Sequence, residues 1–98
     1  MGEAVIVSFA HKPTAALWRG LKPPELPPAI HKTALRKLTQ LAIATTLDDL
    51  RVPPGNRLEP LVRDRAGQHS IRINDQYRIC FRWVGSNAHQ VEIVDYHS

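Results

Sequence analysis

The chain contains 98 residues, of which 43% are hydrophobic, so it can form one domain, residues 1–98, with a modest core. Its formal net charge of +4 favours an anionic partner only weakly. The single cysteine, Cys80, excludes a disulfide within the chain and a zinc site built from cysteine pairs, and we expect it to be structural. The N-terminus lacks the basic and apolar regions of a signal peptide, and no stretch is long enough to span a membrane. We therefore expect a cytoplasmic protein without a membrane contact, a metal or a cofactor.

The first thirty residues predict a strand, a short helix and an extended connector. Residues 5–9 are rich in β-branched side chains, which favours a strand. Pro13 can occupy the first turn of a helix, which we place at residues 14–19. Residues 21–28 hold four of the eight prolines and must be extended.

A longer amphipathic helix is predicted at residues 28–44. Apolar residues recur there at helical spacing, at Ile30, Ala34, Leu38 and Leu41. The opposite side is largely basic and holds His31, Lys32, Arg36, Lys37 and Gln40. We interpret this side as solvated, with contact to nucleic acid or to an acidic partner as the alternative. Residues 46–49 then match a capping pattern for one more short turn.

Residues 70–83 alternate apolar and polar side chains at period two, which predicts a β-hairpin. The loop length decides the register. A two-residue loop would place Arg72 on the apolar face. A three-residue loop at 74–76 keeps one clean apolar face and pairs Arg72 with Arg78. Two like charges directly opposite are unfavourable, so such a pair is either solvated or held for an anionic ligand.

The C-terminal residues predict a further strand that continues the sheet. Packing its apolar residues on the same core face requires a five-residue loop, 84–88, centred on Ser86. Tyr96 then lies on the arginine face, with His97 within reach. Guanidinium, phenol and imidazole groups together can bind phosphate and transfer protons, and this surface holds Arg72, Arg78, Arg82, Tyr96 and His97. The alternative is an ordinary solvated strand face. The order strand, helix, helix, antiparallel strands predicts a small α+β domain with the helices packed on one face of the sheet.

Four segments carry a family resemblance: SFAHK from Ser8, RLEPL from Arg57, the run DRxGxxSIRINxxYRIxFRW from Asp64, and VDYH from Val94. In these segments the chain resembles the HigB-like toxins of the RelE/ParE superfamily. The resemblance implies a RelE-like fold and a type II toxin that binds the ribosome and cuts messenger RNA in the decoding site. It also implies a small helix-turn-helix, HigA-like antitoxin. Operator DNA would be bound only through the complex of the two proteins.

The resemblance also implies functional roles for particular residues. It assigns the chemistry to Arg78, Tyr96 and His97, and the hairpin register adds Arg72. The chain departs from the family at two positions, where a histidine and a lysine are replaced by Glu59 and Val62. Further RNA-binding candidates are Arg63, next to the lost lysine, Arg65 in a loop, Arg82 on the hairpin, and Asn74 at a position that is basic in the family.

The resulting hypothesis is RNA cleavage in which the 2′-hydroxyl of the RNA attacks the adjacent phosphate. Arg78 and Arg72 would stabilise the charge on the phosphorane, and His97 would act as acid or base. Tyr96 would stack on a nucleobase or order the hydroxyl. Glu59 would be the general base if it lies on the same face. Two alternatives remain: an inactive relative that acts by antitoxin binding and promoter co-repression, and a ParE-like inhibitor of DNA gyrase.

Overall fold

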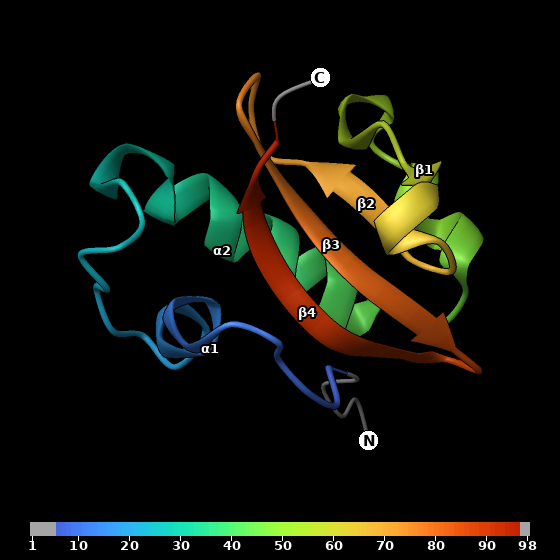
Figure 1. Cartoon of the computed structure of the whole chain (residues 1–98), viewed down its shortest axis with the longest axis horizontal. Helices are drawn as coiled ribbons and strands as arrows, with labels where there is room; N and C mark the ends of the chain where they lie inside the picture. The colour runs from blue at the N-terminus through green and yellow to red at the C-terminus, as the bar shows by residue number, and fades with distance from the viewer. Residues whose placement is uncertain (1–5, 97–98) are drawn as a thin grey trace.

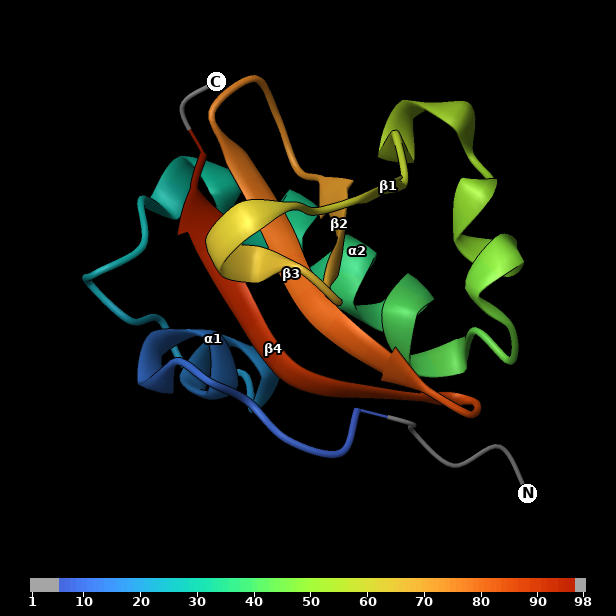
Figure 2. The same ribbon diagram turned by 45° about the vertical axis from the view of Figure 1, so that its right-hand side comes forward.

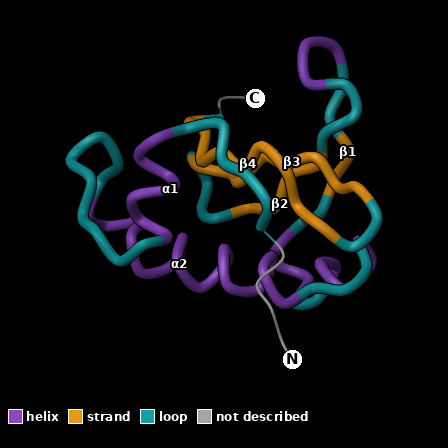
Figure 3. The backbone as a smooth tube through the Cα atoms, turned by 90° about the horizontal axis from the view of Figure 1, so that it is seen from below, coloured by secondary structure: helices purple, strands orange, loops and turns teal. Residues whose placement is uncertain are grey.

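The computed structural model describes residues 6–96, in which a four-stranded antiparallel sheet packs against two helices (Figure 1). The strand order follows the chain, β1-β2-β3-β4. The strands are β1 (Glu59–Pro60), β2 (His69–Arg72), β3 (Tyr77–Val84) and β4 (Asn87–Asp95), and the helices are α1 (Lys12–Trp18) and α2 (Pro28–Ile43). Seen from below, α2 lies along one side of the strands (Figure 3). The predicted α+β class with helices on one sheet face is confirmed. Within residues 6–96, neither helix is long and apolar enough to cross a membrane.

The segment 6–9 runs beside β4 but is not a strand. Ile6 and Phe9 form two isolated parallel bridges with β4. Between these bridges Gln90 bulges out of β4 with φ +53, and its N–H donates to the Ser8 hydroxyl at 2.9 Å. Because the bulge interrupts the ladder of hydrogen bonds, the prediction of a strand is wrong for residues 6–9. Val5, the first residue of the predicted strand, lies outside the described residues.

Helix α2 spans the predicted range to within one residue and buries its predicted apolar stripe. Ile30, Ala34, Leu38 and Leu41 are all buried. The prediction for Lys37 is wrong, because this residue is only 7% exposed rather than part of the solvated basic side. Its Nζ donates to the side-chain oxygen of Asn56. A buried ammonium group needs such an acceptor, and a sequence pattern cannot show one that lies 19 residues away.

The β2–β3 hairpin has the predicted register. Ile71 pairs with Ile79, and Arg72 pairs with Arg78. The side-chain oxygen of Asn74 accepts the N–H groups of Gln76 and Tyr77 and closes the turn. Both isoleucines are fully buried against the helices, so the arginines extend from the other face.

The β3–β4 hairpin is tighter than predicted. Val84 pairs with Asn87, which leaves a two-residue loop, and Gly85 in that loop has φ +63, a conformation that suits glycine. The predicted five-residue loop is therefore wrong. The bulge in β4 then shifts the pairing by one residue, so that Arg78 pairs with Val94. The predicted five-residue loop would have given the same pairing at this end of the hairpin. The side chains near Arg78 and Val94 therefore lie on the predicted faces of the sheet.

The short turn Leu47–Arg51 begins with the predicted capping box. The Thr46 hydroxyl accepts the N–H of Asp49, and the Asp49 carboxylate accepts the N–H of Thr46. The N–H groups of Thr45 and Thr46 lower the pKa of this carboxyl below its ordinary value of 3.8.

We expect the replacement Asp49→Asn to destabilise the protein at neutral pH and to have no effect in acid. Because the folded-state pKa is the lower one, the carboxylate stabilises the fold above the unfolded-state pKa. That contribution is lost as the pH falls through the folded-state pKa. Urea unfolding at pH 7 and at successively lower pH measures the difference. Asp48→Asn is the matched control, since Asp48 bonds only the exposed Arg51. A difference that stays constant across the pH range would contradict the assignment.

Candidate functional site

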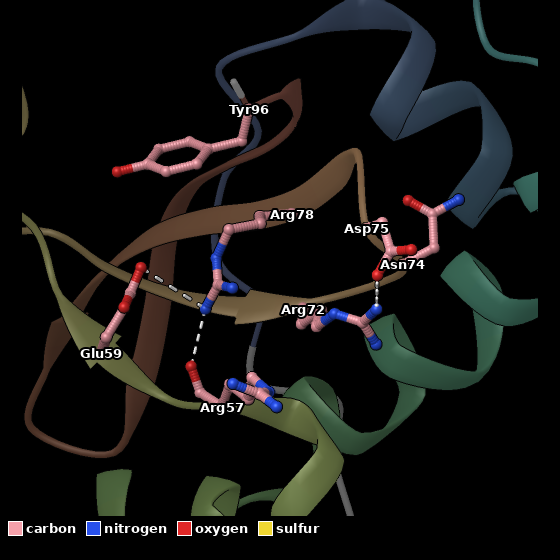
Figure 4. A pocket seen from close by; sticks show the side chains of 7 residues that line it. All are labelled: Arg57, Glu59, Arg72, Asn74, Asp75, Arg78 and Tyr96. Atoms are coloured by element: carbon pink, nitrogen blue, oxygen red, sulfur yellow. Dashed lines mark hydrogen bonds and ion pairs between the residues drawn. The ribbon is translucent and has the colours of Figure 1, made fainter. Parts of the chain in front are cut away.

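A pocket of about 360 Å³ lies where β1, the β2–β3 turn and the end of β4 meet (Figure 4). Three guanidinium groups, two carboxylates, an amide and a phenol line it, from Arg57, Glu59, Arg72, Asn74, Asp75, Arg78 and Tyr96. The predicted residues Glu59, Arg72, Asn74, Arg78 and Tyr96 are thus brought together. Three arginines against two carboxylates leave the pocket with one net positive charge, which suits an anion.

Arg78 is held in place by several contacts. Its Nε donates to the Ser70 hydroxyl at 2.7 Å, and its Nη2 donates to the main-chain oxygen of Arg57 at 2.6 Å. The same Nη2 lies 3.7 Å from a carboxylate oxygen of Glu59, and the Arg78 side chain is only 11% exposed. A cation fixed in this way loses little conformational entropy when an anion binds.

Tyr96 lies on the arginine face, as predicted. Its N–H donates to the main-chain oxygen of Gln76 at 2.7 Å, which extends the pairing of the sheet by one residue beyond β4. The Arg78 guanidinium carbon then lies 5.9 Å from the centre of the phenol ring, within cation–π range. The next predicted residue, His97, lies outside the described residues.

The two paired arginines each have an acidic neighbour. Arg72 forms an ion pair with Asp75 in the hairpin turn, while Arg78 is paired with Glu59 on β1. These carboxylates compensate the cross-strand repulsion between the guanidinium groups. The arginines are therefore partly neutralised by the chain itself before any ligand binds.

The three remaining candidates among the described residues lie outside the pocket. Arg63 is exposed on a turn, with φ +58. Arg65 forms an ion pair with Glu92 at 3.2 Å, and Arg82 donates to the Gln90 side chain at 3.0 Å. Arg82 follows Arg78 by four residues, which corresponds to about 13 Å along a strand. The predicted surface is thus right for one end of the hairpin and does not include Arg82.

Comparison with known proteins assigns the chain to a family. Residues 8–97 match a family model described as the RelE-like toxin of the type II toxin-antitoxin system HigB. The chain belongs to this HigB-like toxin family.

Two relatives show how far individual sequences agree. Toxin HigB-1 of Vibrio cholerae serotype O1 is 48% identical over 63 residues, which covers 64% of this chain and 66% of that toxin. An uncharacterised protein of Haemophilus influenzae is 32% identical over 74 residues, which covers 76% of this chain and 72% of that protein. The chain thus spans slightly less than two thirds of the Vibrio toxin, while the family match includes every residue of the pocket.

Three residues of this HigB-like pocket region are missing from the sequence prediction: Arg57, Ser70 and Asp75. Ser70 alternates with Arg72 on β2 and could have been found by the same period-two argument. Asp75 lies in the predicted turn, next to Arg72 in space. Arg57 contributes its main-chain carbonyl, for which the sequence carries no signal.

The buried polar groups beneath the pocket do not form a metal site. Within residues 6–96, no group of three or more His, Cys, Asp or Glu side chains is placed to hold a metal ion. Cys80 is fully buried and pairs with Ser70 across β2 and β3. The turn Arg63–Arg65 lies over this side of the sheet (Figure 2). Burial raises the pKa of the Cys80 thiol, so it stays protonated, which agrees with a structural role.

Proposed function

We propose that this HigB-like toxin cuts messenger RNA on the translating ribosome and that its pocket binds the scissile phosphate. The observation that carries the proposal is Arg78, a largely buried cation that bonds Ser70 and Arg57 in a positively charged pocket. Arginine can bind a phosphate through two parallel hydrogen bonds, which makes it suited to this position.

In the proposed reaction the RNA supplies its own nucleophile. The 2′-hydroxyl oxygen forms a bond to phosphorus, and the bond between phosphorus and the 5′-oxygen of the next nucleotide breaks. Glu59, which lines the same pocket as Arg78, takes the proton from the 2′-hydroxyl. His97 gives a proton to the leaving 5′-oxygen. Arg78, with Arg72, stabilises the additional negative charge on the phosphorane.

The remaining site residues bind the RNA. We propose that Tyr96 stacks on a base beside the scissile phosphate, since base stacking on an aromatic ring needs no particular sequence. Asn74, at the edge of the pocket, and the exposed Arg63 contact the backbone on either side. Arg65 and Arg82 are less available because each already bonds a side chain of β4.

The distribution of charge supports a ribosomal partner. Residues 6–46, which include both helices, carry six basic side chains and one acidic side chain, whereas residues 47–96 carry seven of each. All four ion pairs among the described residues fall in the second group. Five cations of the first group are exposed, namely Lys12, Arg19, Lys22, Lys32 and Arg36. An extended polyanion such as ribosomal RNA is a suitable partner for these exposed cations.

We expect the double replacement Lys32→Gln and Arg36→Gln to weaken ribosome binding. These exposed residues lie four apart on α2 and so share one side of it. If both contact phosphate, the slope of log affinity against log salt falls by about two units, one for each contact. Binding at several salt concentrations measures this slope. The control, Arg51→Gln with Arg65→Gln, removes the same charge from already paired residues. Equal losses in the two proteins would contradict a docking role for the helices.

The neutralising partner in this proposal is a helix-turn-helix, HigA-like antitoxin in the cytoplasm, and operator DNA is contacted only through the complex of toxin and antitoxin. One observation favours a second function. Because Glu59 and Asp75 neutralise the pocket arginines, an inactive relative that acts by antitoxin binding and co-repression is the alternative.

Expression of the toxin without its antitoxin tests the proposal. Messenger RNA cleavage and translation arrest are expected. Normal growth would favour the inactive relative, and a DNA damage response would favour inhibition of gyrase.

A further inference from the structure

Arg57 has an unusual backbone conformation for a residue that lines a binding pocket. It follows the turn Pro54–Asn56 and is left-handed, with φ 46 and ψ 54. Only a few per cent of residues other than glycine adopt a positive φ. This conformation directs the main-chain oxygen of Arg57 to Nη2 of Arg78, at 2.6 Å. The backbone of Arg57 thus contacts Arg78, the proposed phosphate-binding residue, directly.

A buried polar network holds the residue that precedes Arg57. Asn56 is fully buried, and its amide nitrogen donates to the Gln40 side chain at 3.0 Å and to the main-chain oxygen of Leu50 at 3.1 Å. Its side-chain oxygen accepts from the ammonium group of Lys37 on α2. An amide with partners on both its donor and acceptor sides has one favourable orientation. The network therefore fixes the end of the turn to the helix behind the sheet.

Two residues, Ser70 and Arg57, accept the hydrogen bonds that orient the Arg78 guanidinium group. The Ser70 hydroxyl accepts from Nε, and the Arg57 carbonyl accepts from Nη2 (Figure 4 shows the second bond). Ser70 alone would hold Nη2 only through its main-chain oxygen, at the longer distance of 3.4 Å. The shorter bond to Arg57 restricts rotation about the bond between Nε and the guanidinium carbon, so the two Nη groups keep their places.

We propose that Arg57 is a positioning residue that acts through its main-chain carbonyl, held left-handed by the buried Lys37–Asn56 pair. This orients Arg78 before RNA arrives. The catalytic consequence rests on the proposed nuclease function, whereas the orientation of Arg78 can be measured without it. The guanidinium group of Arg57 itself is not required for this role.

Three replacements at Arg57 distinguish the effect of its backbone conformation from the effect of its side chain. Arg57→Gly, Arg57→Asn and Arg57→Val all remove the guanidinium group. Glycine and asparagine adopt left-handed backbone readily, whereas β-branched valine strongly disfavours it. Any difference between the valine protein and the other two therefore reports the conformation of the backbone.

The direct readout is nitrogen NMR of the Arg78 side chain, assigned by the loss of its signals in Arg78→Lys. Restricted rotation, with resolved Nη signals, is expected in the wild type and in the glycine and asparagine proteins. Averaged signals are expected in the valine protein. In the ribosomal cleavage assay, valine is expected to lower kcat by about tenfold to a hundredfold relative to glycine, with KM little changed. Identical Arg78 signals in the glycine and valine proteins would overturn the proposal.

Lys37→Met tests the other end of the network, with the exposed Lys32→Met on the same helix as the matched control. Averaged Arg78 signals are expected for Lys37→Met alone. If this protein does not fold, the comparison of glycine with valine at residue 57 decides the question. If no protein cuts RNA but the NMR difference remains, the nuclease function fails and the positioning role stands.

Discussion

Replacing Arg78 with alanine is expected to lower messenger RNA cleavage on translating ribosomes by about 100- to 1000-fold, the usual effect of removing one preorganised donor to transition-state charge. The loss should appear mainly in kcat, because the charge on the phosphorane exists only in the transition state. Arg78→Lys should recover little, since an ammonium group cannot bond Ser70 and Arg57 and a phosphate in the same fork geometry. Single-turnover cleavage of a defined message measures all three proteins.

Arg82→Ala is the matched control for Arg78→Ala. Arg82 lies on the same strand and bonds only the Gln90 side chain at the other end of the hairpin. Its replacement removes the same charge but leaves the pocket intact. Cleavage that falls equally in both proteins would indicate a general effect of charge and would contradict a specific role for Arg78.

Replacing Glu59 with glutamine is expected to lower kcat by about a hundredfold or more if its carboxylate takes the proton from the 2′-hydroxyl. Glutamine keeps the size of the side chain and its position beside Arg78, so the change is chiefly the loss of a base. Asp75→Asn is the matched control. It removes the 99% exposed carboxylate that pairs with Arg72 without removing the proposed base, so kcat should not fall.

The opposite result at Glu59 would have a clear meaning. If Glu59 serves only to neutralise Arg78, then Glu59→Gln frees that guanidinium group, and RNA binding becomes tighter while kcat is unchanged or higher. This outcome would rule out Glu59 as the base. It would also support the alternative in which carboxylates of the chain keep the pocket inactive, and His97 would then be the candidate base.

The β2–β3 hairpin shows what could be predicted from the sequence. Its side chains alternate strictly, and a shift by one residue would bury Arg72, so only one register satisfies the pattern. The same alternation argument placed Tyr96 on the arginine face, where its ring lies near Arg78. The argument held although its predicted loop was wrong, because the bulge at Gln90 restored the register that the longer loop would have given. A bulge that depends on a contact with the distant Ser8 leaves no local signal.

The irregular segment before β1 could not be predicted in the same way. Residues 52–57 have no periodicity, so neither the left-handed Arg57 nor the burial of Asn56 follows from the pattern. Lys37 was assigned to the solvated side for the same reason, since its acceptor belongs to this segment. The contacts that hold Arg78 thus come partly from alternation along strands and partly from a turn that only the three-dimensional structure reveals.

The chemical nature of the cut ends tests the account most directly. Purified toxin would be incubated with ribosomes that translate a defined message, and the 3′ end of the upstream fragment would be analysed. Attack by the 2′-hydroxyl leaves the phosphate on that fragment, so we predict a 2′,3′-cyclic phosphate, or the 3′-phosphate formed from it, with the wild type and almost none with Arg78→Ala. Uncut message, or fragments that end in a 3′-hydroxyl, would contradict the account.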